Sequence, residues 1–201
     1  MTKQRDESIK TLEVIEKLYG YYNKASVEQI ETGGDWYQDA HDSAIILAMQ
    51  HNLPLFKVCG VIAALSPRNK WERNLYDTDN MLANPSVETK TCTFKTNRRK
   101  AIKILEAADE SIVKDILNGE KTRAFFDNIL YPETSVETTV DVWMYRAANL
   151  GTGVVNYRIV KHAVEYIALQ ETELPMVIQA VIWGVIRDGV NNSSNQLEEV
   201  A

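Results

Sequence analysis

Lys121 and Asp141 are the residues whose types and positions are best suited to chemistry. Lys121 follows the tight turn Asn118-Gly119, and Asp141 comes directly after Val140, where a helix is expected to begin. A carboxylate stabilises positive charge that develops beside it and can orient a nucleophile. A lysine whose ammonium group is partly desolvated can act as an amine nucleophile and form a Schiff base. We therefore expect these two side chains to carry any catalysis.

A second candidate region is the polar segment that follows an apolar stretch. Leu55–Leu65 is apolar nearly all round, and Ser66-Pro67 ends it because proline disfavours helix at the preceding residue. Basic and aromatic residues follow, which is typical of a surface that binds a ligand. Candidate substrate-binding or DNA-binding residues, here and beside the two catalytic candidates, are Ser66, Arg68, Asn69, Lys70, Trp71, Asn118, Gly119, Arg123 and Trp143.

Each of these residues also has a purely structural interpretation. Asp141 could serve only as an N-cap, and Lys121 could be a solvated lysine in the first turn of a helix. Tryptophans such as Trp71 and Trp143 are more often core residues than ligand contacts. The sequence leaves these alternatives open.

The elements that would position these residues are helices throughout. Apolar residues recur at steps of three and four, and no pair of strands is evident. We expect Gly33-Gly34 to break the chain and Asp35 to cap the next helix. The expected helices are 8–24, 35–50, 55–65, 69–82, 97–108, 110–117, 121–130, 141–150, 157–169 and 173–188, with a short extended piece at 135–140. Residues 1–188 would form a single all-α domain, and residues 189–201 a disordered tail.

Composition and charge limit the class of protein. The chain has 201 residues, 45% hydrophobic and 25% charged, which is ordinary for a globular protein. Its net charge of −6 argues against non-specific nucleic-acid binding, but residues 95–103 hold five basic residues and no acid. Two cysteines and three scattered histidines predict no disulfide framework, metal site or other cofactor. No apolar run approaches a membrane span and the N-terminal residues lack a signal-peptide core, so we expect a cytoplasmic monomer.

The order of these segments resembles the helix-hairpin-helix DNA glycosylase superfamily, of the endonuclease III-like kind. That family has an apolar helix ending in a polar wedge loop, then a helix-hairpin-helix, then a Val-Asp segment at a helix N-terminus. Leu65-Ser66-Pro67 falls where the wedge loop would be, Leu117-Asn-Gly119 at the hairpin, and Val140-Asp141 with Arg146 at the Asp segment. Lys121 precedes Asp141 by 20 positions, similar to the gap in bifunctional members. The resemblance spans residues 36–187 and implies two helical lobes around a cleft, the N- and C-terminal helices in one lobe and the middle helices in the other.

Several departures qualify what the resemblance implies. The hairpin has one glycine followed by Glu120 where the family usually has two glycines, and Trp143 stands where many members have histidine. The sequence lacks the cysteine cluster that holds an iron–sulfur centre in some members, so no such centre is expected. These features, with the acidic charge, are similar to a divergent, phage-type branch, which would place the protein in the host cytoplasm. The function implied is a hydrolase that acts on a base in DNA, taking a modified or flipped base into its site.

Two other functions stay open. One is a transferase on the same fold that takes part in hypermodification of thymine in phage DNA, where the amine of a small molecule attacks an activated base. The acidic net charge suits it better than simple repair. The other is a non-catalytic module that binds DNA or a protein, which the single-glycine hairpin at Gly119 favours.

Overall fold

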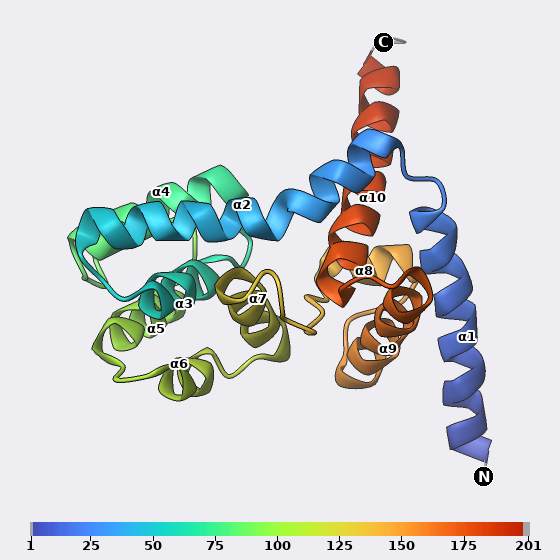
Figure 1. Ribbon diagram of the computed structural model, residues 1–201, viewed down its shortest axis with the longest axis horizontal. Coiled ribbons are helices and arrows are strands. Elements are labelled where there is room, and N and C mark those ends of the chain that lie inside the picture. The colour runs from blue at the N-terminus through green and yellow to red at the C-terminus, as the bar shows by residue number, and fades with distance from the viewer. Residues whose placement is uncertain (1, 199–201) are drawn as a thin grey trace. The chain divides into compact units, whose positions relative to one another are not determined.

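The protein is all-α, as the sequence predicts. A computed structural model describes residues 2–198, and the side chains of residues 6–189 (Figure 1). The described residues form ten helices and no strand. The helices are α1 Thr2–Tyr22, α2 Val27–His51, α3 Leu55–Leu65, α4 Trp71–Ala83, α5 Lys95–Glu106, α6 Glu110–Leu117, α7 Glu120–Leu130, α8 Val142–Ala147, α9 Val154–Glu171 and α10 Pro175–Glu198.

The helices divide into two compact units. Unit 1 contains the chain up to Tyr37 and from Val136 onwards, and unit 2 contains Gln38–Ser135. The N- and C-terminal helices therefore share one unit and the middle helices form the other. α2 supplies its first residues to unit 1 and the remainder to unit 2.

Unit 1 is built on the packing of α1, α8, α9 and α10. α1 lies along α9 (Figure 1), where Lys10 Nζ donates to Asn156 Oδ1 at 2.9 Å and the Tyr19 hydroxyl donates to Glu171. The core between these helices is aliphatic and aromatic. Its most deeply buried side chains are Leu18, Met144, Ala148, Val160, Ala163, Val164, Ile167, Ile178 and Ile182. This core fixes the position of the segment that carries Asp141.

Unit 2 is organised around α3, which packs against α4, α5, α6 and α7. Every α3 residue from Val58 to Leu65 is buried, which confirms the prediction of a buried central helix. Among the described residues no single helix is long and apolar enough to cross a membrane, although α2 and α3 taken together as a bent pair meet those limits of length and composition.

Several helix ends differ from expectation, and the two largest differences are in α2 and α10. α2 does not start at Asp35 but at Val27, because Ser26 and Gln29 form a reciprocal capping box: each backbone N–H donates to the other's side chain. The helix then continues through Gly33-Gly34. α10 extends to Glu198, so residues 189–198, expected in a disordered tail, are helical; no proline interrupts them. Residues 199–201 of that tail lie outside the described residues.

The two cysteines should differ sharply in reactivity. Cys59 lies in the buried face of α3, where burial raises the pKa of its thiol to about 12, whereas Cys92 is exposed. Because the thiolate is the reactive form, a colorimetric thiol reagent at pH 8 should modify Cys92 promptly and Cys59 at least about a hundredfold more slowly. Both should react in denaturant. Two equally fast thiols in the folded protein would contradict the packing of α3.

Candidate functional site

The segment of residues 66–74, called here the wedge segment, begins where α3 ends. The Ser66 hydroxyl donates to the carbonyl of Ala63 at 2.9 Å, and Asn69 N donates to Ser66 O at 3.1 Å, which closes a tight turn. Arg68 in this turn has a φ of 59°, a left-handed conformation that is uncommon outside glycine and asparagine. α4 starts at Trp71, two residues later than the expected start at residue 69, and residues 71–74 of the wedge segment form its first turn.

The wedge segment is held from beneath by the carboxylate of Asp77, whose side chain is 0% exposed. Asp77 Oδ2 accepts from Asn69 Nδ2 at 3.0 Å and from the backbone N–H of Cys92 at 2.7 Å. Its Oδ1 accepts from Arg73 Nε at 2.8 Å, and this bond, with the charge of Asp77, raises the pKa of Arg73. One buried carboxylate therefore joins Asn69 and Arg73 of the wedge segment to the loop before α5.

The predicted residues of the wedge segment divide into two groups. Ser66 and Asn69 are half-buried, and their side chains form the bonds that fix the turn. Arg68 and Lys70 are exposed. Trp71 is half-buried in the first turn of α4. Asn69 thus fixes the turn, and the cations on either side of it are exposed to solvent.

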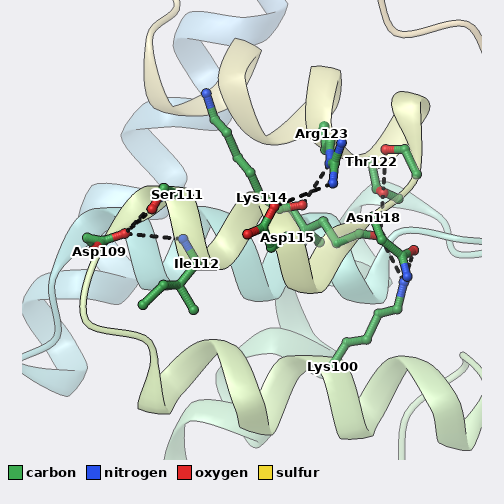
Figure 2. Close-up of polar contacts among 11 residues, drawn as sticks. Lys100, Asp109, Ser111, Ile112, Lys114, Asp115, Asn118, Thr122 and Arg123 are labelled. Carbon is green, nitrogen blue, oxygen red and sulfur yellow. Dashed lines mark hydrogen bonds and ion pairs between the residues drawn. The ribbon is translucent and has the colours of Figure 1, made fainter.

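The hairpin between α6 and α7 is the second predicted site (Figure 2). Asn118 adopts the left-handed conformation with a φ of 51°, and Gly119 is the N-cap of α7. Lys100 of α5 reaches this turn: its Nζ donates to Leu117 O at 2.8 Å and to Asn118 Oδ1 at 2.9 Å (Figure 2). Burial lowers the pKa of Lys100. The side chain of Asn118, expected to contact a ligand, is occupied by this bond.

Most cations of the hairpin are also engaged within it. Arg123 Nε donates to Lys114 O at 2.7 Å, and its Nη2 lies 3.8 Å from the carboxylate of Asp115 (Figure 2). Lys114 Nζ lies 2.7 Å from Asp127 Oδ1. Lys121 differs, because no hydrogen bond or ion pair joins its half-buried side chain to another described residue. Arg123, predicted to bind DNA, therefore has partners within the hairpin. The Lys121 amine has no such partner among the described residues.

α5 joins the wedge segment to the hairpin. Near its start, Asn97 Nδ2 donates to Thr93 Oγ1 at 2.6 Å, and the hydroxyl of Thr93 donates to Pro67 O at 3.3 Å. One helical turn later Lys100 bonds to the hairpin. Because residues three apart lie on the same side of a helix, the two predicted sites are attached to one face of α5. The sequence did not reveal this link, since Lys100 and Asn97 belong to an ordinary basic stretch.

Asp141 lies in unit 1 and Lys121 in unit 2. Asp141 is the N-cap of α8, where its Oδ1 accepts from Trp143 N at 2.9 Å and from Met144 N at 3.1 Å. No hydrogen bond joins Oδ2 to a described residue. The Arg146 guanidinium lies over the Trp143 ring at 4.6 Å from its centroid. Asp141 is thus an N-cap, and one oxygen of its half-buried side chain forms no hydrogen bond with another described residue.

Among the described residues, no group of three or more histidine, cysteine, aspartate or glutamate side chains is arranged to hold a metal ion. No curated protein and no solved structure matches the chain significantly. The sequence does match one protein family over residues 1–190, nearly its whole length. The chain therefore belongs to a family of unknown function, DUF7178.

Proposed function

We propose that this protein binds DNA and acts on one of its bases as a glycosylase-like enzyme, with Asp141 as the functional carboxylate. The observation that carries the proposal is the attachment of the wedge segment and the hairpin to one face of α5. In the helix-hairpin-helix DNA glycosylase superfamily, which the sequence resembles, the wedge loop and the hairpin contact DNA. Here one helix and one buried carboxylate, that of Asp77, keep them together in unit 2.

The charges of the wedge segment and α5 support contact with phosphate. The net charge of the chain is −6 and unit 2 as a whole holds 13 basic and 13 acidic residues, yet the wedge segment and α5 together hold eight basic residues against two acids. The exposed basic side chains of the wedge segment and of α5 are Arg68, Lys70, Arg73, Lys95, Arg99 and Lys103. The first backbone N–H groups of α7 lack intrahelical partners and favour an anion, with Lys121 beside them. Lysine and arginine side chains that neutralise phosphates supply most of the non-specific affinity for DNA.

The geometry of Asp141 suits stabilisation of a sugar cation. Breaking an N-glycosidic bond develops positive charge on the sugar, which a nearby carboxylate stabilises. The two backbone N–H groups of α8 hold Oδ1 and so fix the orientation of the whole carboxylate. Oδ2 is left to face the charge. Lys121, with its unengaged amine, is the candidate nucleophile for a Schiff base.

The test is a base-release and borohydride-trapping assay on a panel of DNAs that carry modified bases. The key variant is Asp141→Asn, because asparagine caps a helix about as well as aspartate and only the charge is removed. Asp109 provides a matched control: it caps α6 by accepting from the N–H groups of Ser111 and Ile112. We expect base release to be lost in Asp141→Asn and kept in Asp109→Asn.

The other outcomes separate the alternatives. A trapped adduct that disappears in Lys121→Ala would support the amine mechanism, whereas base release unchanged in Asp141→Asn would overturn the role of the carboxylate. Salt-dependent DNA binding without release from any DNA would favour the binding module. Incorporation of an amine donor into DNA that carries an activated thymine derivative would favour the transferase.

A further inference from the structure

Two arginine side chains of unit 2 lie over exposed aromatic rings. The Arg68 guanidinium carbon is 5.4 Å from the centroid of the Phe94 ring, and that of Arg73 is 5.1 Å from the centroid of Tyr76. Phe94 is 52% exposed and Tyr76 is 58% exposed. Large apolar side chains left this exposed are informative when they gather beside fixed polar groups.

Both pairs are held around the same buried group, Asp77. It binds Arg73 directly, and it binds Asn69, the neighbour of Arg68. It also binds the backbone of Cys92, two residues before Phe94. One carboxylate therefore binds the Arg73 side chain directly and holds the chain next to Arg68 and two residues before Phe94. The backbone of Arg68 adopts the left-handed conformation, which is strained for a residue other than glycine. Such strain concentrates at functional positions.

A ring beside a guanidinium matches the chemistry of an unpaired nucleotide. Bases stack on aromatic rings without regard to sequence, while arginine binds phosphate or stacks on the base. In an intact duplex the base faces are covered by their neighbours, so only the phosphates would be contacted. Residues 66–77 and 88–95, which supply the two pairs, hold five basic residues against the three acids Glu72, Asp77 and Glu88. Cations thus outnumber acids in these two segments of a chain that is acidic as a whole.

We propose that the Arg68–Phe94 and Arg73–Tyr76 pairs bind unpaired nucleotides, so that the preferred substrate is DNA with an unpaired stretch and not intact duplex. This rests on the proposed function and specifies its substrate class. Phe94 and Tyr76 are then binding residues that the wedge segment and hairpin do not include.

The test compares binding of a fluorescent single-stranded oligothymidylate with binding of a duplex of the same length, by anisotropy at low ionic strength. We expect the native protein to bind the single strand more tightly. Phe94→Leu and Tyr76→Leu should each weaken single-strand binding by about five- to a hundredfold and leave duplex binding nearly unchanged. Tyr76→Phe keeps the ring and should bind as the native protein does. Tyr166→Leu, which removes a ring 47% exposed on α9 in unit 1, is the matched control and should have no effect.

The failures of the two proposals are distinguishable. Duplex binding with base release, but without preference for the single strand, would overturn the inference and leave the proposed function standing. If the Leu variants weaken single-strand binding and duplex binding by the same factor, with melting curves unchanged, the inference is also overturned. Stacking on unpaired bases would then not be the cause of the weaker binding. Absence of binding to either DNA would overturn both.

Discussion

Replacing Asp77 with alanine is expected to lower the free energy of unfolding by about 2–4 kcal/mol. Asp77 is wholly buried and accepts hydrogen bonds from Asn69, Arg73 and the backbone N–H of Cys92. The variant removes all three bonds and leaves the Cys92 N–H without its acceptor. The loss is smaller than for a fully buried ion pair, because the Arg73 side chain is 45% exposed and water can solvate it. Urea denaturation followed by circular dichroism measures the change.

Two further variants identify the cause. Asp79 lies on the same helix, and its side chain is 52% exposed where it accepts from His51 at 2.7 Å. Asp79→Ala should change stability by less than about 1 kcal/mol. Asp77→Asn keeps one acceptor oxygen, so its effect should fall between the two. If Asp77→Ala and Asp79→Ala destabilise equally, the burial of Asp77 is not what matters.

The Asp77→Ala variant should also loosen the loop before α5. The amide hydrogen of Cys92 is held only by this carboxylate among the described residues, so its exchange with deuterium should accelerate when the acceptor is lost. Exchange at buried α3 amides such as those of Val61 and Ile62 should change no more than the global stability does. A protected Cys92 amide in the variant would mean that another group holds the loop.

Local sequence signals predicted much of the fold. The bounds of α3 and α6 agree with prediction because chain-breaking residues mark both ends of each helix. Pro54 precedes α3 and Ser66-Pro67 follows it, while Asp109 caps α6 and the left-handed Asn118 ends it. The prediction of a helix boundary failed where it rested on one residue type alone, as it did at the two glycines of α2. Gly33-Gly34 reads as a break in the sequence, yet the capping box at Ser26 starts the helix earlier and tertiary packing carries it through.

The sequence was enough to name candidate site residues, but it did not show the contacts that hold them in place. The sequence singled out Arg68, Lys70 and Lys121 as cations available to a ligand, and in the structure their side chains form no hydrogen bond with another described residue. It could not show that Lys100 ties the hairpin to α5 or that Asp77 lies beneath the wedge segment. Both contacts join residues that periodicity treats as ordinary surface positions. Their partners include a main-chain carbonyl, that of Leu117, and a main-chain amide, that of Cys92, which no side-chain pattern encodes.

The two adjacent glycines of α2 provide the last prediction, because replacing each with alanine should change stability in opposite directions. Both lie inside a helix, where alanine is favoured over glycine by about 0.5–1 kcal/mol. At Gly34 a Cβ atom would meet nothing within 4 Å. Gly34→Ala should therefore raise the free energy of unfolding by about that amount.

At Gly33 the same gain in stability is outweighed by a steric clash with α10, the neighbouring helix of unit 1. A Cβ atom there would lie 2.6 Å from Val181 Cγ2 and 2.8 Å from both the Cα and N atoms of Val181. The backbone of α10 cannot rotate out of the way as a side chain can, so α2 and α10 must move apart. We expect Gly33→Ala to lower the free energy of unfolding by about 1–3 kcal/mol. If both variants stabilise the protein, the close approach of α2 to α10 is wrong; if both destabilise it, the continuity of α2 through these glycines is wrong.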